Sequence, residues 1–580
     1  MLKQLAGCVR EYKRPTILTL IFIVGEAVIE TIIPFITANL VNRIKAGASI
    51  ESVMEVGLLL IIMAAISLVC GGLAGFTCAK ASTGFAKNLR SDLFHRIQTY
   101  SFENIDKFSS SSLVTRMTTD VTNVQMAFMM LIRIAIRSPL LLIFSTVMAF
   151  VMGGKLAFVF VVVIPILALG LLAIGKKAMP AFRSVFKKYD RLNESIEENV
   201  RGMRVVKGFS REEYEKQKFN TAADNIRKDF TKAECIVALN TPLMNLCMYI
   251  NMVVVLLVGS KLAITSGGSA LDVGQISGML TYGMQILMSL MMLSMIYVMV
   301  TMSAESAKRI CEVLEEEPSL KEPENPVMEV KDGSIEFKNV NFKYSAKAKK
   351  YALSDIDLSI RSGMTVGIIG GTGSSKSSLV QLIPRLYDVT EGAVLVGGVD
   401  VRSYDIPALR SAVAMVLQKN VLFSGTIKDN LRWGNETATD EEIREACRLS
   451  QADEFIQTFP DKYDTYIEQG GSNVSGGQKQ RLCIARALLK KPKILILDDS
   501  TSAVDTKTDA LIRTGFKNYI PDTTKIIIAQ RIASVEDADL IIVMDNGSIS
   551  AAGTHEDLLQ SSDIYREVYE QQTKGGNENE

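Results

Sequence analysis

A glycine- and serine-rich loop is the clearest candidate for chemistry in this sequence. It follows the apolar run Thr365–Ile369, which is typical of a buried strand, and it precedes the helical pattern of Leu379–Leu386. Its residues are Gly370, Gly371, Thr372, Gly373, Ser374, Ser375, Lys376, Ser377 and Ser378. Glycines let backbone N–H groups wrap phosphates, a lysine meets the β- and γ-phosphate oxygens, and a hydroxyl binds Mg²⁺. Taken alone, the loop is either a nucleotide site or a Gly/Ser loop with a chance lysine, because Ser375 stands where the usual pattern has glycine.

Two further segments favour the nucleotide site. The run Lys493–Leu497 is typical of a second buried strand, and it ends in Asp498 and Asp499. A carboxylate at such a strand end can hold Mg²⁺ through water. Ahead of it, the glycine-rich turn Ser475–Gln478 opens a helix over Gln478–Leu489, and a helix N-terminus favours an anion. Three such elements in this order predict a site for a nucleoside triphosphate.

The composition of the chain excludes several other kinds of site. Its net charge of +1 argues against a nucleic-acid binder that relies on a basic surface. Only two histidines, His95 and His555, occur in 580 residues, which excludes a three-histidine zinc centre. The eight cysteines form no C-x-x-C pair, so they are interpreted as small buried side chains of a reducing compartment.

The elements that position this site follow a long apolar half. Mean hydropathy is +0.20 although 22% of residues are charged, which indicates one apolar and one water-soluble part. Six apolar segments are long enough to cross a bilayer, which needs roughly 20 helical residues: about 15–40, 54–78, 127–152, 156–175, 237–260 and 273–303. The segments 79–126 and 176–236 are rich in lysine and arginine, and the positive-inside rule makes them cytoplasmic, together with both termini.

These patterns predict an α-helical membrane domain of six helices with long cytoplasmic extensions, fused to an α/β domain with a phosphate-binding loop. The predicted domain boundaries are an amphipathic elbow segment over 1–14, the membrane domain over 15–310, a charged linker over 311–334, the nucleotide-binding domain over 335–570 and a disordered tail over 571–580.

The motifs and spans together resemble the ATP-binding cassette (ABC) exporters over about residues 1–570. The resemblance implies that Lys376 contacts the phosphates of ATP and that Ser377, Gln418 and Asp498 serve Mg²⁺. The other implied roles are adenine stacking by Tyr344, an X-loop acid at Glu468, the signature motif Ser475, Gly476, Gly477 and Gln478, and a D-loop over 502–505 that ends in Asp505. In this family the signature of one subunit caps the ATP held by the other, so the chain is expected to be half of a dimer.

Two catalytic positions depart from the family pattern. The glutamate that polarises the attacking water is replaced by Asp499, which is one methylene shorter, and the switch histidine is replaced by Gln530. A displacement of the catalytic carboxylate by about 1 Å can cost on the order of 10²-fold in rate. Glutamine can donate a hydrogen bond, but unlike histidine it cannot take up a proton or carry a positive charge. We therefore predict a degenerate ATP site in a heterodimeric, multidrug-type exporter, whose partner half-transporter supplies the intact catalytic residues. The alternative is an ordinary homodimer with slow hydrolysis.

The transported substrate is poorly encoded. Span six is rich in methionine, including Met288 and Met295, and flexible thioethers suit either a promiscuous cavity or ordinary apolar packing. Glu26 and Glu30 share a face of span one, and Arg137 lies in span three with Arg133 one turn earlier. Charges at membrane depth are expensive, so these residues either pair across helices or attract cationic substrates.

The sequence thus predicts an ATP- and Mg²⁺-dependent exporter subunit that moves drugs, peptides or lipids out of the cytoplasm. By family resemblance, the segments 104–112 and 201–209 lie near the helices that couple the two domains. The expected partners are a second half-transporter, membrane lipid and an amphipathic substrate, without nucleic acid. The expected location is a bacterial plasma membrane, with the ATPase domain in the cytoplasm. A hypothesis of another class is a nucleotide-gated regulatory membrane protein that transports nothing.

Overall fold

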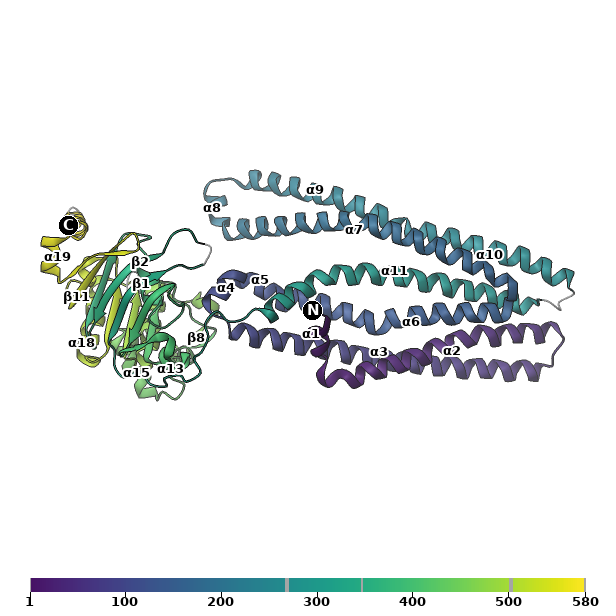
Figure 1. Ribbon diagram of the computed structural model, residues 1–580, viewed down its shortest axis with the longest axis horizontal. Coiled ribbons are helices and arrows are strands. Elements are labelled where there is room, and N and C mark those ends of the chain that lie inside the picture. The colour runs from purple at the N-terminus through teal and green to yellow at the C-terminus, as the bar shows by residue number, and fades with distance from the viewer. Residues whose placement is uncertain (1, 267–270, 346–347, 500–503, 578–580) are drawn as a thin grey trace. The chain divides into compact units, whose positions relative to one another are not determined.

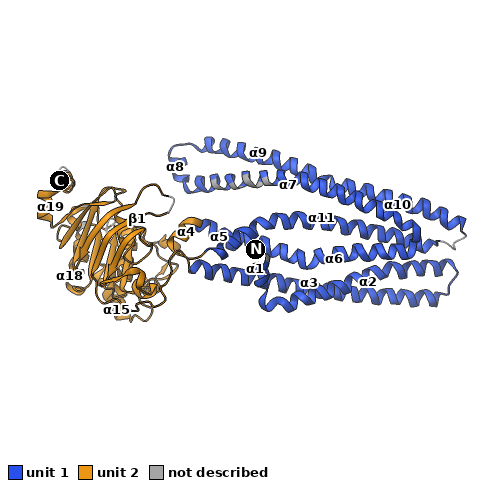
Figure 2. Ribbon diagram, in the orientation of Figure 1, with its two compact units in different colours: residues 1–98, 109–316 blue, residues 99–108, 317–580 orange. Residues whose placement is uncertain are grey.

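The apolar half of the chain folds into long helices and the charged half into an α/β unit. The computed structural model describes all residues except 1, 267–270, 346–347, 500–503 and 578–580. Contacts divide the chain into two units, one formed by residues 1–98 and 109–316 and the other by residues 99–108 and 317–580 (Figure 2). The predicted order of a helical membrane domain followed by an α/β domain is therefore confirmed.

The first unit is a set of long helices joined by short turns (Figure 1). The six longest apolar helices are α2 (Lys13–Lys45), α3 (Ile50–Gln98), α6 (Val121–Gly153), α7 (Phe158–Arg201), α10 (Asn240–Thr265) and α11 (Val273–Glu315). The shorter helices are α1 (Leu2–Gly7), α5 (Ser110–Thr115), α8 (Met203–Gly208) and the charged α9 (Glu212–Ala238). A π-helical turn, η2 (Arg116–Asp120), joins α5 to α6.

Helix length and hydropathy mark five stretches of the described chain as membrane spans: 10–45, 50–98, 110–182, 212–265 and 273–315. The third contains α6 and the first part of α7, which the 3₁₀ turn η3 (Gly154–Ala157) separates. The six predicted spans therefore correspond to six helices. Large apolar side chains such as Leu68 and Leu169 are exposed on these helices, whereas small ones such as Ala27 and Ala74 are buried between them. This distribution is the one that lipid favours, because small residues let helices approach closely.

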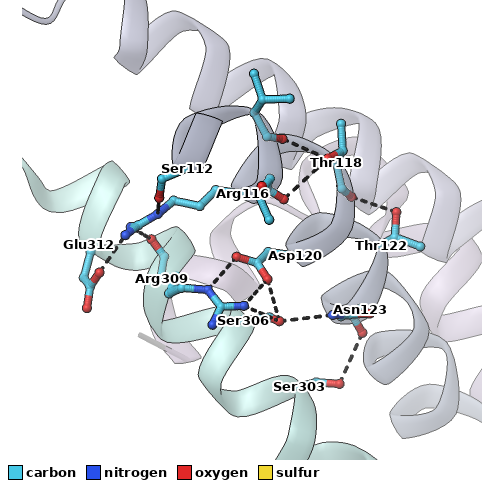
Figure 3. A network of polar contacts seen from close by, with 12 residues as sticks. Ser112, Arg116, Thr118, Asp120, Thr122, Asn123, Ser303, Ser306, Arg309 and Glu312 are labelled. Atoms are coloured by element: carbon cyan, nitrogen blue, oxygen red, sulfur yellow. Dashed lines mark hydrogen bonds and ion pairs between the residues drawn. The ribbon is translucent and has the colours of Figure 1, made fainter. Parts of the chain in front are cut away.

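A buried polar network ties the start of α6 to the end of α11 (Figure 3). Asp120 has no exposed surface, and its carboxylate accepts hydrogen bonds from Arg309 (Nε–Oδ2, 2.8 Å) and from Ser306 (Oγ–Oδ1, 2.8 Å). One turn away, Arg116 donates to Glu312 at 3.1 Å. A buried carboxylate without such partners would be strongly destabilising, so this network fixes the register of the two helices.

The second unit is built on a six-stranded sheet in the order β12-β11-β3-β10-β9-β6. Its strands are β3 (Thr365–Gly370), β6 (Val413–Val416), β9 (Ile494–Asp498), β10 (Thr524–Ile528), β11 (Leu540–Asp545) and β12 (Ser548–Gly553). All neighbours are parallel except β11 and β12. An antiparallel sheet in the order β2-β1-β4-β5 contains β1 (Ile335–Phe342), β2 (Leu353–Ile360), β4 (Glu391–Val396) and β5 (Val399–Asp400). The short β7 (Gly425–Thr426) pairs with β8 (Tyr466–Ile467).

Helices and two hydrophobic cores cover the faces of the six-stranded sheet. Alternate residues of its strands enter different cores, as the period-2 geometry of a strand requires: Leu495 and Ile527 enter one, and Ile496 and Ile526 the other. The α-helices of this unit are α4 (Phe102–Phe108), α12 (Lys376–Gln381), α13 (Ile406–Ala412), α14 (Ile427–Arg432), α15 (Asp440–Leu449), α16 (Asp453–Ile456), α17 (Gly476–Leu489), α18 (Thr506–Tyr519), α19 (His555–Ser561) and α20 (Asp563–Asn577).

Three boundaries differ from those expected. Helix α11 continues to Glu315, beyond the expected end of the membrane domain at 310. Residues 99–108, expected within the membrane domain, belong to the α/β unit. Helix α20 continues to Asn577, so the prediction of disorder from residue 571 is wrong for residues 571–577. The polar composition of that tail concealed the buried anchors earlier in the helix, such as Tyr565.

Candidate nucleotide-binding site

The carboxyl ends of three parallel strands bring the predicted site residues to one edge of the sheet. Strand β10 pairs with β3 and β9 in parallel, and Ile528 lies in register with both Ile368 and Asp498. The loop after β3, the carboxylates at the end of β9 and the segment after β10 therefore start side by side. In open α/β sheets, ligands bind outside the carboxyl ends of the strands.

The lysine of the predicted phosphate loop is held inside that loop. Lys376 begins α12, and its Nζ donates to the carbonyl oxygens of Gly370 (2.7 Å) and Gly371 (2.8 Å) and lies 3.3 Å from Ser374 Oγ. Burial lowers the pKa of this ammonium, an effect that the nearby charges of Asp498 and Asp499 oppose. The loop thus presents a cation among backbone groups, as binding of a phosphate chain requires.

The backbone of this loop favours glycine at several positions, including the position that Ser375 occupies. A Cβ on Gly370 would lie 2.3 Å from the carbonyl oxygen of Met544, and Gly373 has φ +86°. Ser375 has φ +70° and ψ 25°, a left-handed conformation that glycine adopts without strain. A serine there costs on the order of 1 kcal/mol. Ser375 therefore occupies a position whose backbone suits the usual glycine.

Ser377 and Asp498 form the part of the site that fits Mg²⁺. The Ser377 hydroxyl donates to Asp498 Oδ1 at 3.0 Å, and Asp498 is only 4% exposed. Burial raises the pKa of Asp498, and the hydrogen bond from Ser377 opposes that rise. Hydroxyl and carboxylate oxygens are the ligands Mg²⁺ prefers, with phosphates and water completing its shell. Within the described residues no cluster of three or more His, Cys, Asp or Glu side chains forms a separate metal site.

Asp499 and Gln530, the two departures from the family pattern, are in direct contact. The amide Nε2 of Gln530 donates to Asp499 Oδ2 at 2.8 Å, and Nε2 of Gln418 lies 3.3 Å from the same oxygen. Asp499 has φ +49°, and its backbone N–H donates to the carbonyl oxygen of Ile528 at 3.0 Å. Gln418, expected to serve Mg²⁺, thus donates here to Asp499. One carboxylate oxygen joins three segments that are distant in sequence.

The glycine-rich turn predicted to bind an anion opens a long helix. Ser475 is the N-cap of α17: its Oγ accepts from the Gln478 N–H at 3.3 Å, while Gln478 Oε1 accepts from the Ser475 N–H at 2.9 Å. Gly476 and Gly477 are the first two residues of the helix, and they carry no side chain that would cover its N-terminus. Among the residues described, no hydrogen bond joins this turn to the phosphate loop. A free helix N-terminus of this kind is able to bind an anion supplied from outside the chain's own loop.

The remaining predicted residues of this unit lie around the site. Tyr344 is half-exposed, and its hydroxyl lies 2.7 Å from Ser378 Oγ, which places the ring beside the helix that follows the phosphate loop. Asp505 is the N-cap of α18, and the backbone N–H of Thr508 holds the pKa of its carboxyl low. This contact shows a capping role. Glu468 accepts from Ser472 Oγ at 2.6 Å. The D-loop residues 502–503 lie outside the described part of the chain.

A residue that sequence reasoning missed connects this region to α4. The hydroxyl of Tyr387 donates to Asp106 Oδ2 at 2.8 Å, and its ring packs edge-on against Tyr344 with ring centres 5.2 Å apart. Asn104 Nδ2 donates to the carbonyl oxygen of Glu317 at 3.0 Å. Helix α4 overlaps the predicted coupling segment 104–112, and these contacts dock it onto the α/β unit. The other predicted coupling segment, 201–209, contains the exposed helix α8 of the first unit.

The charged residues at membrane depth pair across helices. Arg137 of α6 donates from Nη2 to both carboxylate oxygens of Glu30 on α2 (2.7 and 2.8 Å), and its Nε lies 3.4 Å from Glu26 Oε1. Arg133 lies beside Gly75 of α3. Of the two predicted alternatives, the structure shows pairing. Met288 and Met295 of α11 are exposed within this unit, and none of the contacts described for these residues indicates a ligand.

Both halves of the chain match known protein families. Residues 16–290 match the ABC transporter transmembrane region, and residues 353–502 match the ABC transporter domain. The chain is 36% identical over 555 residues to the uncharacterized ABC transporter ATP-binding protein YfiB of Bacillus subtilis, covering 96% of each. It is 35% identical over 564 residues to Rv1273c of Mycobacterium tuberculosis, again covering 96% of each. Its fold is similar to that of a bacterial Atm1-family ABC exporter with ATP bound, with TM-score 0.85, 23% identity and coverage of 97% and 99%.

Proposed function

The chain belongs to the ABC transporter family as a half-transporter with one membrane domain and one ATP-binding domain, and from this premise we propose that it is the degenerate-site subunit of a heterodimeric exporter. In this role its own phosphate loop retains ATP and cleaves it slowly. Its signature turn completes a second site, in which the partner supplies the phosphate loop and the catalytic glutamate.

The contact between Asp499 and Gln530 carries this proposal. A hydrolytic carboxylate must reach and polarise a water molecule next to the γ-phosphate. Asp499 is one methylene shorter than glutamate, and its Oδ2 already accepts from Gln530 at 2.8 Å with Gln418 3.3 Å away. The groups suited to hold ATP, Lys376 and the Ser377–Asp498 pair, are in place. The arrangement favours binding over cleavage.

The intact signature turn supports a partner with a competent site. The Ser475–Gln478 capping box preforms the N-terminus of α17, so the turn is ready to receive a phosphate from another subunit. A homodimer with slow hydrolysis is the second candidate, because it uses the same contacts in two identical sites. A regulatory protein without transport is the third, and it would hydrolyse ATP in vesicles without moving any solute.

We propose amphipathic compounds such as drugs, peptides or lipids as substrates, moved outward across a bacterial plasma membrane with the ATPase domain in the cytoplasm. The exposed methionines of α11, among them Met288 and Met295, support a cavity that adapts to varied apolar ligands. Arg137 pairs with both Glu26 and Glu30 and offsets one of their two negative charges, so these carboxylates are already engaged within the chain, which argues against a strongly cation-selective cavity at this depth.

Two substitutions distinguish a heterodimer from a homodimer. Gly477→Asp introduces a carboxylate, which a helix N-terminus tolerates, at the place where the phosphate would bind. Lys376→Ala removes the phosphate contact of this chain's own loop. In the purified full complex, we expect G477D to lower steady-state ATP turnover at least about 100-fold and K376A to lower it only a few-fold. Equal loss in both variants would refute the heterodimer, because two identical sites need both groups.

A further inference from the structure

We propose that Gln572, on the last helix of the chain, is a positioning residue for the ATP site. It holds the segment Ala529–Ile532, here termed the switch segment, through two hydrogen bonds to its backbone. Through this segment it places the Gln530 side chain against Asp499, and so it holds that carboxylate in the orientation from which it performs the slow cleavage proposed for this site. The inference rests on the proposed role of Gln530 at this chain's own ATP site.

The Gln572 carboxamide makes two hydrogen bonds to the switch segment. Its Nε2 donates to the backbone carbonyl oxygen of Gln530 at 2.8 Å, and its Oε1 accepts from the backbone N–H of Ile532 at 2.9 Å. On the other side, Gln530 Nε2 donates to Asp499 Oδ2 at 2.8 Å. A chain of hydrogen bonds therefore connects α20 to the carboxylate that stands in the catalytic position.

The switch segment needs such a partner because the sheet no longer supports it. Strand β10 ends at Ile528, and the Ala529 N–H, which donates to the Ile368 carbonyl oxygen at 3.2 Å, is the last group that continues the pairing with β3. A neighbouring strand would next offer a donor and an acceptor. The Gln572 carboxamide offers both from one side chain, and so it fixes the backbone position from which Gln530 reaches Asp499.

The anchor of Gln572 is earlier in its helix. Tyr565 has no exposed surface, and its hydroxyl lies 2.8 Å from His555 Nδ1. Val568, one turn before Gln572, packs against the main core of the unit. Gln572 itself is exposed and fills no space in the core. Its replacement therefore leaves no cavity, and a loss of activity is not a consequence of a damaged core.

A second contact confines the effect to the switch segment. Beyond Ile532, the buried Ser534 donates from Oγ to Asp509 Oδ2 of α18 at 3.0 Å. This bond holds the following 3₁₀ turn η7 (Ile532–Ser534) independently of Gln572. Loss of the Gln572 contacts should accordingly loosen residues 529–532 and leave the rest of the fold in place.

Three variants of the full-length chain, in the complex from which it is purified, test the proposal. Gln572→Ala removes both contacts. Gln572→Glu keeps an acceptor for the Ile532 N–H but sets a carboxylate against the Gln530 carbonyl oxygen. Gln571→Ala is the matched control, because Gln571 lies next along the same helix and bonds only to Glu567 within it, at 3.2 Å, among the contacts described. The readouts are single-turnover cleavage of labelled ATP held by this chain, and hydrogen exchange at the Ile532 amide.

We expect Q572A to slow cleavage about 10-fold at saturating ATP while ATP affinity changes less than two-fold. The Ile532 amide should lose its protection from hydrogen exchange. Q572E should slow cleavage similarly while that amide stays protected. Q571A should match the wild type. A purely structural role of Gln572 predicts instead a lower melting temperature and weaker ATP binding with an unchanged cleavage step, and that result would overturn the proposal.

A double-mutant comparison separates this inference from the function on which it rests. If Gln572 acts through Gln530, then Q572A has no further effect on cleavage in a Gln530→Ala background. Additive effects would contradict the inference. If Q530A slows cleavage and Q572A does not, the inference alone fails. If Q530A itself leaves cleavage unchanged, the proposed role of Gln530 fails and the inference fails with it.

Discussion

Replacing Asp499 with glutamate should speed ATP cleavage at this chain's own site, by about 10-fold alone and by about 100-fold when Gln530 is also replaced with histidine. The substitution moves the carboxylate outward by one C–C bond, about 1.5 Å. Misplacement of a catalytic group by about 1 Å can cost on the order of 10²-fold in rate. Two factors of ten correspond to about 2.7 kcal/mol in the activation free energy.

The surroundings of Asp499 decide how much of this gain is realised. Its Oδ2 accepts from Gln530 at 2.8 Å and lies 3.3 Å from Gln418 Nε2. A longer side chain carries the carboxylate past these amides, and Gln530 still cannot supply the proton or charge of a histidine. We therefore expect D499E alone to gain about 10-fold, and D499E with Gln530→His to approach the full 100-fold. ATP affinity should change less than two-fold, since Lys376 and Ser377 are untouched.

The assay is single-turnover cleavage of labelled ATP retained by this chain with saturating Mg²⁺, so that a faster partner site contributes nothing. Asp499→Asn is the matched control, because it preserves length and removes charge, and it should give no gain. Asp499 has φ +49°, a conformation that aspartate tolerates better than glutamate, so the melting temperature must be measured alongside. If folded, ATP-binding D499E/Q530H cleaves ATP within two-fold of the wild type, side-chain length and the switch residue do not limit hydrolysis.

Two further predictions concern the loop and the membrane. Ser375→Gly should relieve the left-handed strain at φ +70° and raise thermal stability by about 0.5–1 kcal/mol, or tighten ATP binding by a comparable amount. The control Ser374→Gly should do neither. Differential scanning fluorimetry with and without ATP measures both effects, and the absence of any gain would contradict the prediction. Arg137→Gln should destabilise the detergent-solubilised chain by on the order of 2 kcal/mol, because it leaves Glu26 and Glu30 without their cation. Adding Glu30→Gln should recover part of this loss. Thermal unfolding of the single and double variants measures the coupling, and purely additive effects would refute the pairing.

Sequence alone located the glycine-rich loop and the neighbouring residues that fit Mg²⁺, because these depend on local pattern. A glycine loop between a buried strand and a helix fixes Lys376 and Ser377 within one turn. Asp498 follows from a second strand, since parallel strands end at the same edge of the sheet. The six spans follow equally from apolar runs of sufficient length.

The contacts that sequence did not reveal join residues far apart along the chain. The Gln530–Asp499 bond spans 31 positions and the Gln572–Gln530 bond spans 42. Nothing in the periodicity of 99–108 indicates that this segment docks on the α/β unit, because that depends on Tyr387 meeting Asp106. The polar composition from residue 571 onward predicts disorder, although helix α20, which buried side chains such as Tyr565 anchor, continues to Asn577.

The two departures from the family pattern, Asp499 and Gln530, lie in direct contact. A glutamine at position 530 carries an amide that needs an acceptor, and Asp499 offers one at 2.8 Å. The phosphate-holding groups lie in a separate loop, so neither change disturbs the bonds of Lys376 or Ser377. We therefore expect each single variant, D499E or Q530H, to cleave ATP more slowly than the double variant D499E/Q530H. On the proposed function, the site therefore cleaves ATP slowly while it keeps the groups suited to hold ATP.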